Sequence, residues 1–193
     1  MSYKREDFEI MAPVGSYESL MAAIQAGANS VYFGIDKLNM RSRSASNFST
    51  EDLRKIVKIC QENNVKSYLT VNTVIYNDDI ELMHEIVDTA KEVNVSAIIA
   101  ADVAVMLYAF EKGVEVHLST QLNIANVEAL KFYARYADVV VLARECNMEQ
   151  VAQIWKAIQD EKICGPNGEL IKIEMFCHGE LCMAVSGKCY LSL

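Results

Sequence analysis

Segments with the periodicity of a strand alternate with segments with the periodicity of a helix along the whole of this 193-residue chain. Seven stretches are rich in aliphatic and β-branched residues, and we expect strands at 8–13, 30–34, 66–72, 97–102, 115–121, 138–143 and 171–176. Six segments between them carry apolar residues at helical spacing. Strict alternation predicts a parallel sheet covered by helices, because each parallel connection has to cross over the sheet.

Polar residues indicate where several helices begin. Ser49 with Asp52, and Asn147 with Gln150, have the spacing of capping boxes, and Ser16 is a candidate N-cap. We expect the second helix to bury Cys60 and the sixth to bury an apolar stripe of Val151, Ile154, Trp155 and Ile158. Asp102 follows the fourth strand and either caps the next helix or projects into a site.

Two architectures fit this pattern, an open doubly wound sheet and a (β/α)8-like TIM-type barrel. The dinucleotide fingerprint G-x-G-x-x-G and the P-loop are both absent, so we favour the barrel. A complete barrel takes about 250 residues. We therefore expect residues 1–193 to be a single, incomplete α/β barrel-like domain with seven strands and six helices, the N-terminal part of a longer protein.

Composition limits the compartment and the partners. No apolar stretch approaches the roughly 18 residues of a membrane span, and the N-terminus lacks a hydrophobic signal region. We expect a cytoplasmic protein without a membrane partner, whose cysteines stay reduced unless they hold metal. The net charge of −8, with no basic run longer than two residues, argues against a nucleic-acid platform formed by this chain alone.

Near its end the chain reads E-M-F-C-H-G-E-L-C-M-A-V-S-G-K-C-Y-L-S. Cys177, Cys182 and Cys189 follow the spacing C-x4-C-x6-C, with His178 and Glu180 between the first two. Thiolates and an imidazole this close together suit a transition metal or an iron–sulfur cluster. The spacing differs from the C-x2-C of common zinc sites, and three reduced, buried cysteines are the alternative.

This string resembles the signature of the collagenase-like peptidases of unassigned catalytic type, family U32. The family pattern is roughly E-x-F-x-x-G-[small]-[aliphatic]-C-x4-G-x-C-x-[aliphatic]-S. Its fixed positions match Glu174, Phe176, Gly179, Cys182, Gly187, Cys189 and Ser192. Glu180 departs from it, since the strict pattern has Ser or Ala there. The opening stretch APVGSYESLMAAIQAGANSVYFG is also similar to the start of this family.

The resemblance implies a barrel and, for several members, oxygen-independent hydroxylation of transfer-RNA uridine, ribosomal-RNA cytidine or a quinone precursor. Those members use a [4Fe-4S] cluster held by four cysteines, with prephenate as the apparent oxygen source, and the resemblance implies the same cofactor and donor here. Cys182 and Cys189 correspond to two of the ligands, and the other two would lie beyond Leu193. Cys177 is not a fixed position of the pattern.

Barrel enzymes place their active sites at the carboxyl ends of the strands, where this chain collects polar residues. The candidate catalytic residues are Arg41, Arg144, Glu145, His178 and Glu180. The candidate substrate-binding residues are Arg43, Asn72, Thr120, Gln121 and Asn123. Arginines beside amides suit a small anion such as prephenate. The loop at 35–48 otherwise reads as a solvated loop, and its likeness to the family string N-x-R…A-x-N-F is what favours Arg41.

Two functions follow from these residues. We expect the full-length protein to be an iron–sulfur-dependent hydroxylase of RNA bases that contacts RNA through parts outside this chain, which should be inactive by itself. The alternative is a peptidase, which needs an activated nucleophile or a metal-bound water. The motifs H-E-x-x-H and G-x-S-x-G are absent. A zinc site on Cys182, Cys189 and His178, or a pair of His178 with a cysteine, remains open.

Overall fold

The computed structural model describes residues 4–35, 38–40, 48–179 and 183–188. Strands and helices alternate through this part of the chain, as the sequence predicts. The strands are β1 (Met11–Pro13), β2 (Ser30–Gly34), β3 (Lys66–Val71), β4 (Ala97–Ala100), β5 (Val116–Leu118), β6 (Val139–Val141) and β7 (Lys172–Glu174). The α-helices are α1 (Tyr17–Gln25), α2 (Thr50–Glu62), α3 (Ile80–Glu92), α4 (Val103–Glu111), α5 (Val127–Tyr133) and α6 (Met148–Glu161).

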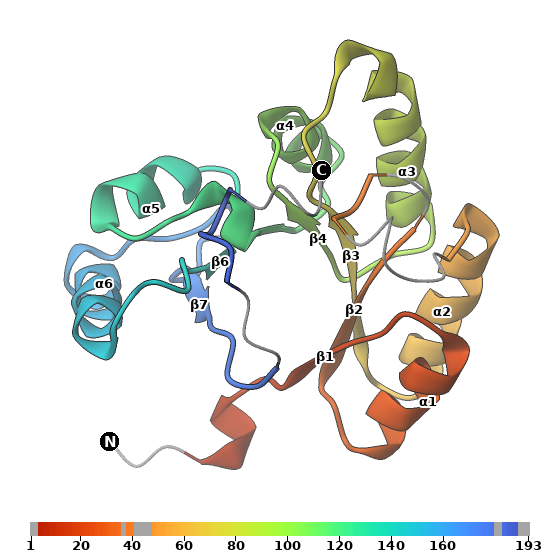
Figure 1. The fold of residues 1–193 in the computed structure, drawn as a ribbon, viewed down its shortest axis with the longest axis horizontal. Helices are drawn as coiled ribbons and strands as arrows, with labels where there is room; N and C mark the ends of the chain where they lie inside the picture. Colours follow the sequence, from red (N-terminus) through yellow and green to blue (C-terminus); the bar gives the residue numbers. More distant parts are fainter. Residues whose placement is uncertain (1–3, 36–37, 41–47, 180–182, 189–193) are drawn as a thin grey trace.

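The described strands form one sheet of seven, in the order β1-β2-β3-β4-β5-β6-β7, and every neighbouring pair is parallel. Spatial order equal to chain order is the topology of a (β/α) barrel and differs from that of a doubly wound sheet, whose strand order reverses at a switch point. The sheet curls into a half-barrel, with the helices outside the curl and β1 and β7 at its edges (Figure 1). The predicted incomplete TIM-like α/β fold is confirmed.

The outer face of the sheet carries most of the core. Strand residues of one parity, such as Phe33, Leu69 and Leu118, are fully buried in one large cluster with the inner faces of the helices. Cys60 of α2 lies in that cluster with no exposed surface, as predicted, and burial raises the pKa of its thiol to about 11. A parallel sheet needs helices of this kind to cover its apolar face.

The helix starts agree with the predicted caps. The side chains of Ser16, Ser49 and Asn147 each accept a hydrogen bond from the backbone N–H three residues on. Asp102 also caps α4, because its Oδ1 accepts from the N–H of Ala104 at 2.8 Å. The capping alternative for Asp102 is therefore the one that the structure shows.

Several strands are shorter than predicted, and one buried position is wrong. The segment predicted as a strand at 8–13 pairs only from Met11, and Phe8 and Ile10 before it are exposed. The segment predicted at 115–121 leaves the sheet after Leu118 and turns into the short 3-10 helix η3 (Thr120–Leu122). Trp155 is 47% exposed, so the inner stripe of α6 consists of Val151, Ile154 and Ile158 without it.

Two further 3-10 helices lie outside the sheet. The helix η1 (Arg5–Asp7) precedes β1, and the helix η2 (Asn77–Asp79) follows β3.

Within the described residues, no helix combines the length and the apolar character that crossing a bilayer requires.

Candidate functional site at the carboxyl ends of the strands

The loop after β2, which carries Arg41 and Arg43, is held at its base. Ile35 and Phe48 form a parallel β-bridge, and Phe48 packs edge-to-face on Phe33 with ring centroids 6.1 Å apart. The side chain of Asn39 is buried against Gly34 and donates to the carbonyl of Ile35 at 3.1 Å. Arg41 and Arg43 themselves lie outside the described residues, so their assignment stays a prediction.

Asn72, at the end of β3, connects that loop to the end of β5. Its Oδ1 accepts from the N–H of Met40 at 3.1 Å, and its Nδ2 donates to Oγ of Ser119 at 3.3 Å. The same Ser119 oxygen accepts from the N–H of Gln121 at 3.3 Å. Asn72 was predicted to bind substrate. In the structure, the oxygen and the nitrogen of its side-chain amide both bind protein groups.

Thr120, Gln121 and Asn123 lie in and just after η3, where the chain turns out of the sheet. Thr120 and Gln121 are half-buried, and Asn123 is exposed with a left-handed backbone at φ 52°. Asn tolerates that conformation better than most residues do. These side chains are accessible at the rim, and their predicted role in substrate binding is untested by any contact.

Arg144 and Glu145, just after β6, bind the segment between the two motif cysteines. Arg144 donates from Nη2 to the carbonyl of Ala184 at 2.9 Å and from Nε to Oγ of Ser186 at 3.5 Å. The N–H of Ser186 donates to Oε1 of Glu145 at 2.8 Å. This backbone hydrogen bond is the main reason why the pKa of Glu145 lies below its usual value.

The same segment also packs against the end of β5. Gly187 has φ +74°, and a Cβ built on it would lie 2.6 Å from the backbone carbonyl oxygen of Gln121. Glycine is required here on two counts, because of the left-handed backbone and because of the close approach. The contacts therefore bring the turn at 184–187 together with Gln121, Arg144 and Glu145, three residues that the sequence assigned to one rim.

An open cavity of about 350 Å³ lies beside this turn, lined by Arg144, Glu145, Met183, Ala184 and Val185. Met183 is 94% exposed, and Val185 is half exposed. A guanidinium next to accessible apolar side chains suits a ligand with an anionic group on an apolar body. The guanidinium has five N–H donors, and its two hydrogen bonds to described residues leave donors for such a ligand.

The donors proposed for a metal are only partly within the described residues. Cys177 and His178 are exposed, and His178 makes no hydrogen bond or ion pair with another described residue. Glu180, Cys182 and Cys189 lie outside the described residues. No group of three or more His, Cys, Asp or Glu in the described ranges has the arrangement of a metal site.

The amino ends of the strands hold a polar group of residues that the sequence analysis missed. Inside the half-barrel the Tyr68 hydroxyl donates to Glu9, which also pairs with Lys66 at 2.6 Å. The ring of buried His117 lies against that of Tyr68, with centroids 4.6 Å apart. Glu174, the last residue of β7, lies near the same group, because burial, and then the Glu9 carboxylate, raise its pKa to about 7. Alternate polar residues on single strands, such as Lys66 and Tyr68, were the signal that could have revealed this group.

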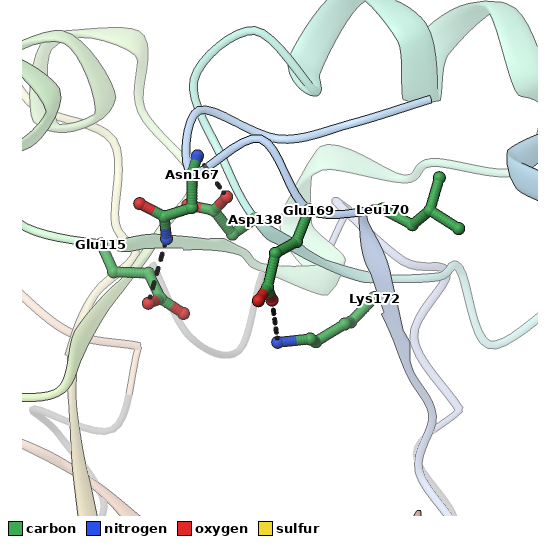
Figure 2. A pocket seen from close by; sticks show the side chains of 6 residues that line it. All are labelled: Glu115, Asp138, Asn167, Glu169, Leu170 and Lys172. Atoms are coloured by element: carbon green, nitrogen blue, oxygen red, sulfur yellow. Dashed lines mark hydrogen bonds and ion pairs between the residues drawn. The ribbon is translucent and has the colours of Figure 1, made fainter. Parts of the chain in front are cut away.

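A small cavity of about 200 Å³ lies next to that polar group, since its lining residue Glu115 contacts His117 at 2.9 Å. Figure 2 shows the side chains around it. It is lined by Glu115, Asp138, Asn167, Glu169, Leu170 and Lys172. Asn167 donates from its backbone to Asp138 at 3.0 Å, and Lys172 pairs with Glu169 at 3.1 Å. These contacts close the turn before β7, so we interpret the cavity as part of the packing at the amino end.

Comparison with known proteins agrees with the fold and with the signature. The family model of peptidase family U32 matches residues 15–193. A collagenase of Porphyromonas gingivalis is 71% identical over 97% of this chain. At lower identity the chain is similar to proteins named for RNA hydroxylation: it is 32% identical to the transfer-RNA hydroxylation protein P1 of Bacillus subtilis over 95% of its length. It is 31% identical to the 23S ribosomal-RNA 5-hydroxycytidine C2501 synthase of Escherichia coli over all of its length.

Among solved structures, the U32 peptidase Mk0906 superposes with a TM-score of 0.66 at 12% identity, covering 89% of this chain and 93% of that one. At this identity the likeness concerns the fold alone. The chain spans less than half the length of the curated relatives named above, 45% of the collagenase, 42% of the Bacillus protein and 27% of the Escherichia protein. The fold, the signature and the match over residues 15–193 together show that the chain belongs to peptidase family U32.

Proposed function

We propose that the complete protein is an iron–sulfur-dependent, oxygen-independent hydroxylase of RNA bases, acting on transfer-RNA uridine or ribosomal-RNA cytidine with prephenate as the donor. One observation carries the proposal. The turn between the two motif cysteines is fastened to the carboxyl ends of β5 and β6, by Gly187 against Gln121 and by Ser186 on Arg144 and Glu145. That rim is where barrels of this kind place their chemistry.

The donor chemistry of this chain fits half of a four-thiolate site. Cys182 and Cys189 would supply two soft ligands, and two further thiolates would come from outside the chain. The cluster, when bound, would supply the electron-transfer chemistry. Arg41 and the free donors of Arg144 would bind the carboxylates of the anionic donor, beside Thr120, Gln121 and Asn123.

RNA contacts would come from other parts of the protein. The net charge of −8 makes this chain a poor surface for phosphates. The role of the described rim is then to bind the small donor and to hold the cysteine segment.

A peptidase is the second candidate, because the 71% identical relative carries the name collagenase. It would need a metal-bound water or an activated nucleophile at the same segment, from Cys182, Cys189, His178 and Glu180. Zinc would then replace the cluster.

Metal content separates the two candidates. We expect iron and acid-labile sulfide in the complete protein purified without oxygen, and their loss in Cys182→Ala and Cys189→Ala. Cys164→Ser is the matched control, because Cys164 is an exposed free cysteine before β7. Mass spectrometry of transfer and ribosomal RNA from a deletion strain should then show a missing hydroxyl mark. Zinc without iron, together with gelatin cleavage that needs Cys182, would establish the peptidase instead.

A further inference from the structure

We infer that Glu145 is a positioning residue and that Arg144, besides its proposed binding of the anionic donor, has a positioning role: together they fix the turn at 184–187 between the two motif cysteines. The link of this turn to a cluster rests on the proposed function, whereas the turn itself is a property of the chain. The sequence alone places both residues among the catalytic candidates, since it shows only two charges at the end of a strand.

Ser186 is the point at which the turn is held. It is 1% exposed although it lies in a rim loop, and its N–H and its hydroxyl both have partners. Its N–H donates to Oε1 of Glu145 at 2.8 Å. Its hydroxyl oxygen accepts from the backbone N–H of Arg144 at 3.3 Å and from Nε of the same residue at 3.5 Å.

The turn has a defined shape as well as an anchor. The N–H of Lys188 donates to the carbonyl of Val185 at 2.9 Å, which closes a four-residue turn. Gly187 supplies the left-handed residue in it, at φ +74°. On the other side, Arg144 donates to the carbonyl of Ala184 at 2.9 Å. The adjacent residues Arg144 and Glu145 thus bind one short segment in complementary ways: Arg144 donates to the carbonyl of Ala184, and Glu145 accepts from the N–H of Ser186.

This arrangement determines what the two residues can contribute. Hydrogen bonds with one charged partner are about twice as strong as neutral ones, so the pair restrains the turn more than an ordinary loop contact would. A turn held in place restricts the relative positions of the chain on its two sides, where the motif has its cysteines. Restraint before binding lowers the ordering cost of a cofactor that both sides have to contact.

The test is hydrogen exchange of the segment at 183–188 in the complete protein, for Glu145→Ala, Glu145→Gln and Ser186→Ala. We expect exchange to rise about tenfold in Glu145→Ala, from the loss of one hydrogen bond to a charged group. Glu145→Gln should exchange nearly as the unaltered protein does, because its amide oxygen still accepts from Ser186. Ser186→Ala keeps that N–H and loses the interactions of its hydroxyl with Arg144 and Glu145, so we expect a smaller rise.

Glu149→Ala is the matched control, since Glu149 is an exposed carboxylate one turn further along, at the start of α6. Iron and acid-labile sulfide per chain form the second readout, and both should fall in Glu145→Ala and recover in Glu145→Gln. Equal exchange in all variants would overturn the positioning role. Iron absent from the unaltered protein would overturn the proposed function, while the exchange result would still decide the role of Arg144 and Glu145.

Discussion

The backbone N–H of Ser186 donates to the carboxylate of Glu145 at 2.8 Å, across 41 residues of sequence. This single bond joins the cysteine segment, the most distinctive sequence of the chain, to the end of β6. A signature that reads as a string of ligands therefore also contains the residues that fold it onto the barrel.

Gly187→Ala should displace the cysteine turn. The added Cβ would lie 2.6 Å from the backbone oxygen of Gln121, and the residue would also keep an unfavourable φ of +74°. We expect a cost on the order of 1–3 kcal/mol, seen in urea unfolding and as faster exchange at 183–188.

Gly168→Ala is the control for that variant. Gly168 has nearly the same φ, +78°, and its added Cβ would meet nothing within 4 Å. Its cost should be about 1 kcal/mol, from backbone conformation alone. Equal effects of the two substitutions would contradict a close contact at Gln121.

Glu174→Gln should change how stability depends on pH. Burial and the nearby Glu9 raise the pKa of Glu174 from 4.5 to about 7 in the folded protein. Between these two pKa values the folded state holds a proton that the unfolded chain has released. The contribution of Glu174 to stability is therefore complete below about pH 4.5 and is lost as the pH rises through about 7. We expect this fall to be on the order of 2 kcal/mol for a half-buried group, and to be absent in the variant.

Urea unfolding at about pH 5 and about pH 8 measures this fall in the free energy of unfolding. Glu149→Gln, which removes an exposed carboxylate at the start of α6, should leave the pH profile unchanged. A Glu174→Gln profile parallel to that of the unaltered protein would refute the assignment.

Gly34→Ala should destabilise the base of the loop that carries Arg41. Its added Cβ would lie 2.3 Å from Cγ of Asn39, whose side chain is buried and has little room to move. We expect a loss of about 1–3 kcal/mol in the free energy of unfolding, as for overpacking in a core.

A double-mutant cycle with Asn39→Ala tests the contact itself. The cost of Gly34→Ala should be smaller when Asn39 is shortened, because the clash is then relieved. Additive costs would show that the two side chains do not compete for the same space.

Asn72→Ala should loosen the connection between the loop after β2 and the end of β5. It removes the acceptor for Met40 N–H and the donor to Ser119, and we expect a loss of about 1–2 kcal/mol with faster exchange at residues 38–40. Asn72→Asp keeps the acceptor and should lose less. Asn63→Ala removes only a bond within one turn at the end of α2, so exchange at residues 38–40 should not respond to it.

The local elements were predictable because their causes are local. Apolar spacing predicts each helix and strand, and Ser49 or Asn147 caps a helix with atoms only three residues away. Trp155 shows the limit of predicting buried positions from helical spacing. Helical spacing put it beside Ile154 and Ile158, but the width of the surface that α6 covers left it 47% exposed.

The sequence by itself determined the alternation of strands and helices, the parallel sheet covered by helices that follows from it, the caps, and, through its signature, the family. The tertiary structure decided what the rim residues bind, because a hydrogen-bond partner 41 residues away leaves no periodic trace in the chain. Only the curled sheet places Arg144 and Glu145 against Ser186, Asn72 between Met40 and Ser119, and a second carboxylate beside Glu174. Spacing along the chain determines which elements form, whereas the curvature of the sheet determines which side chains meet.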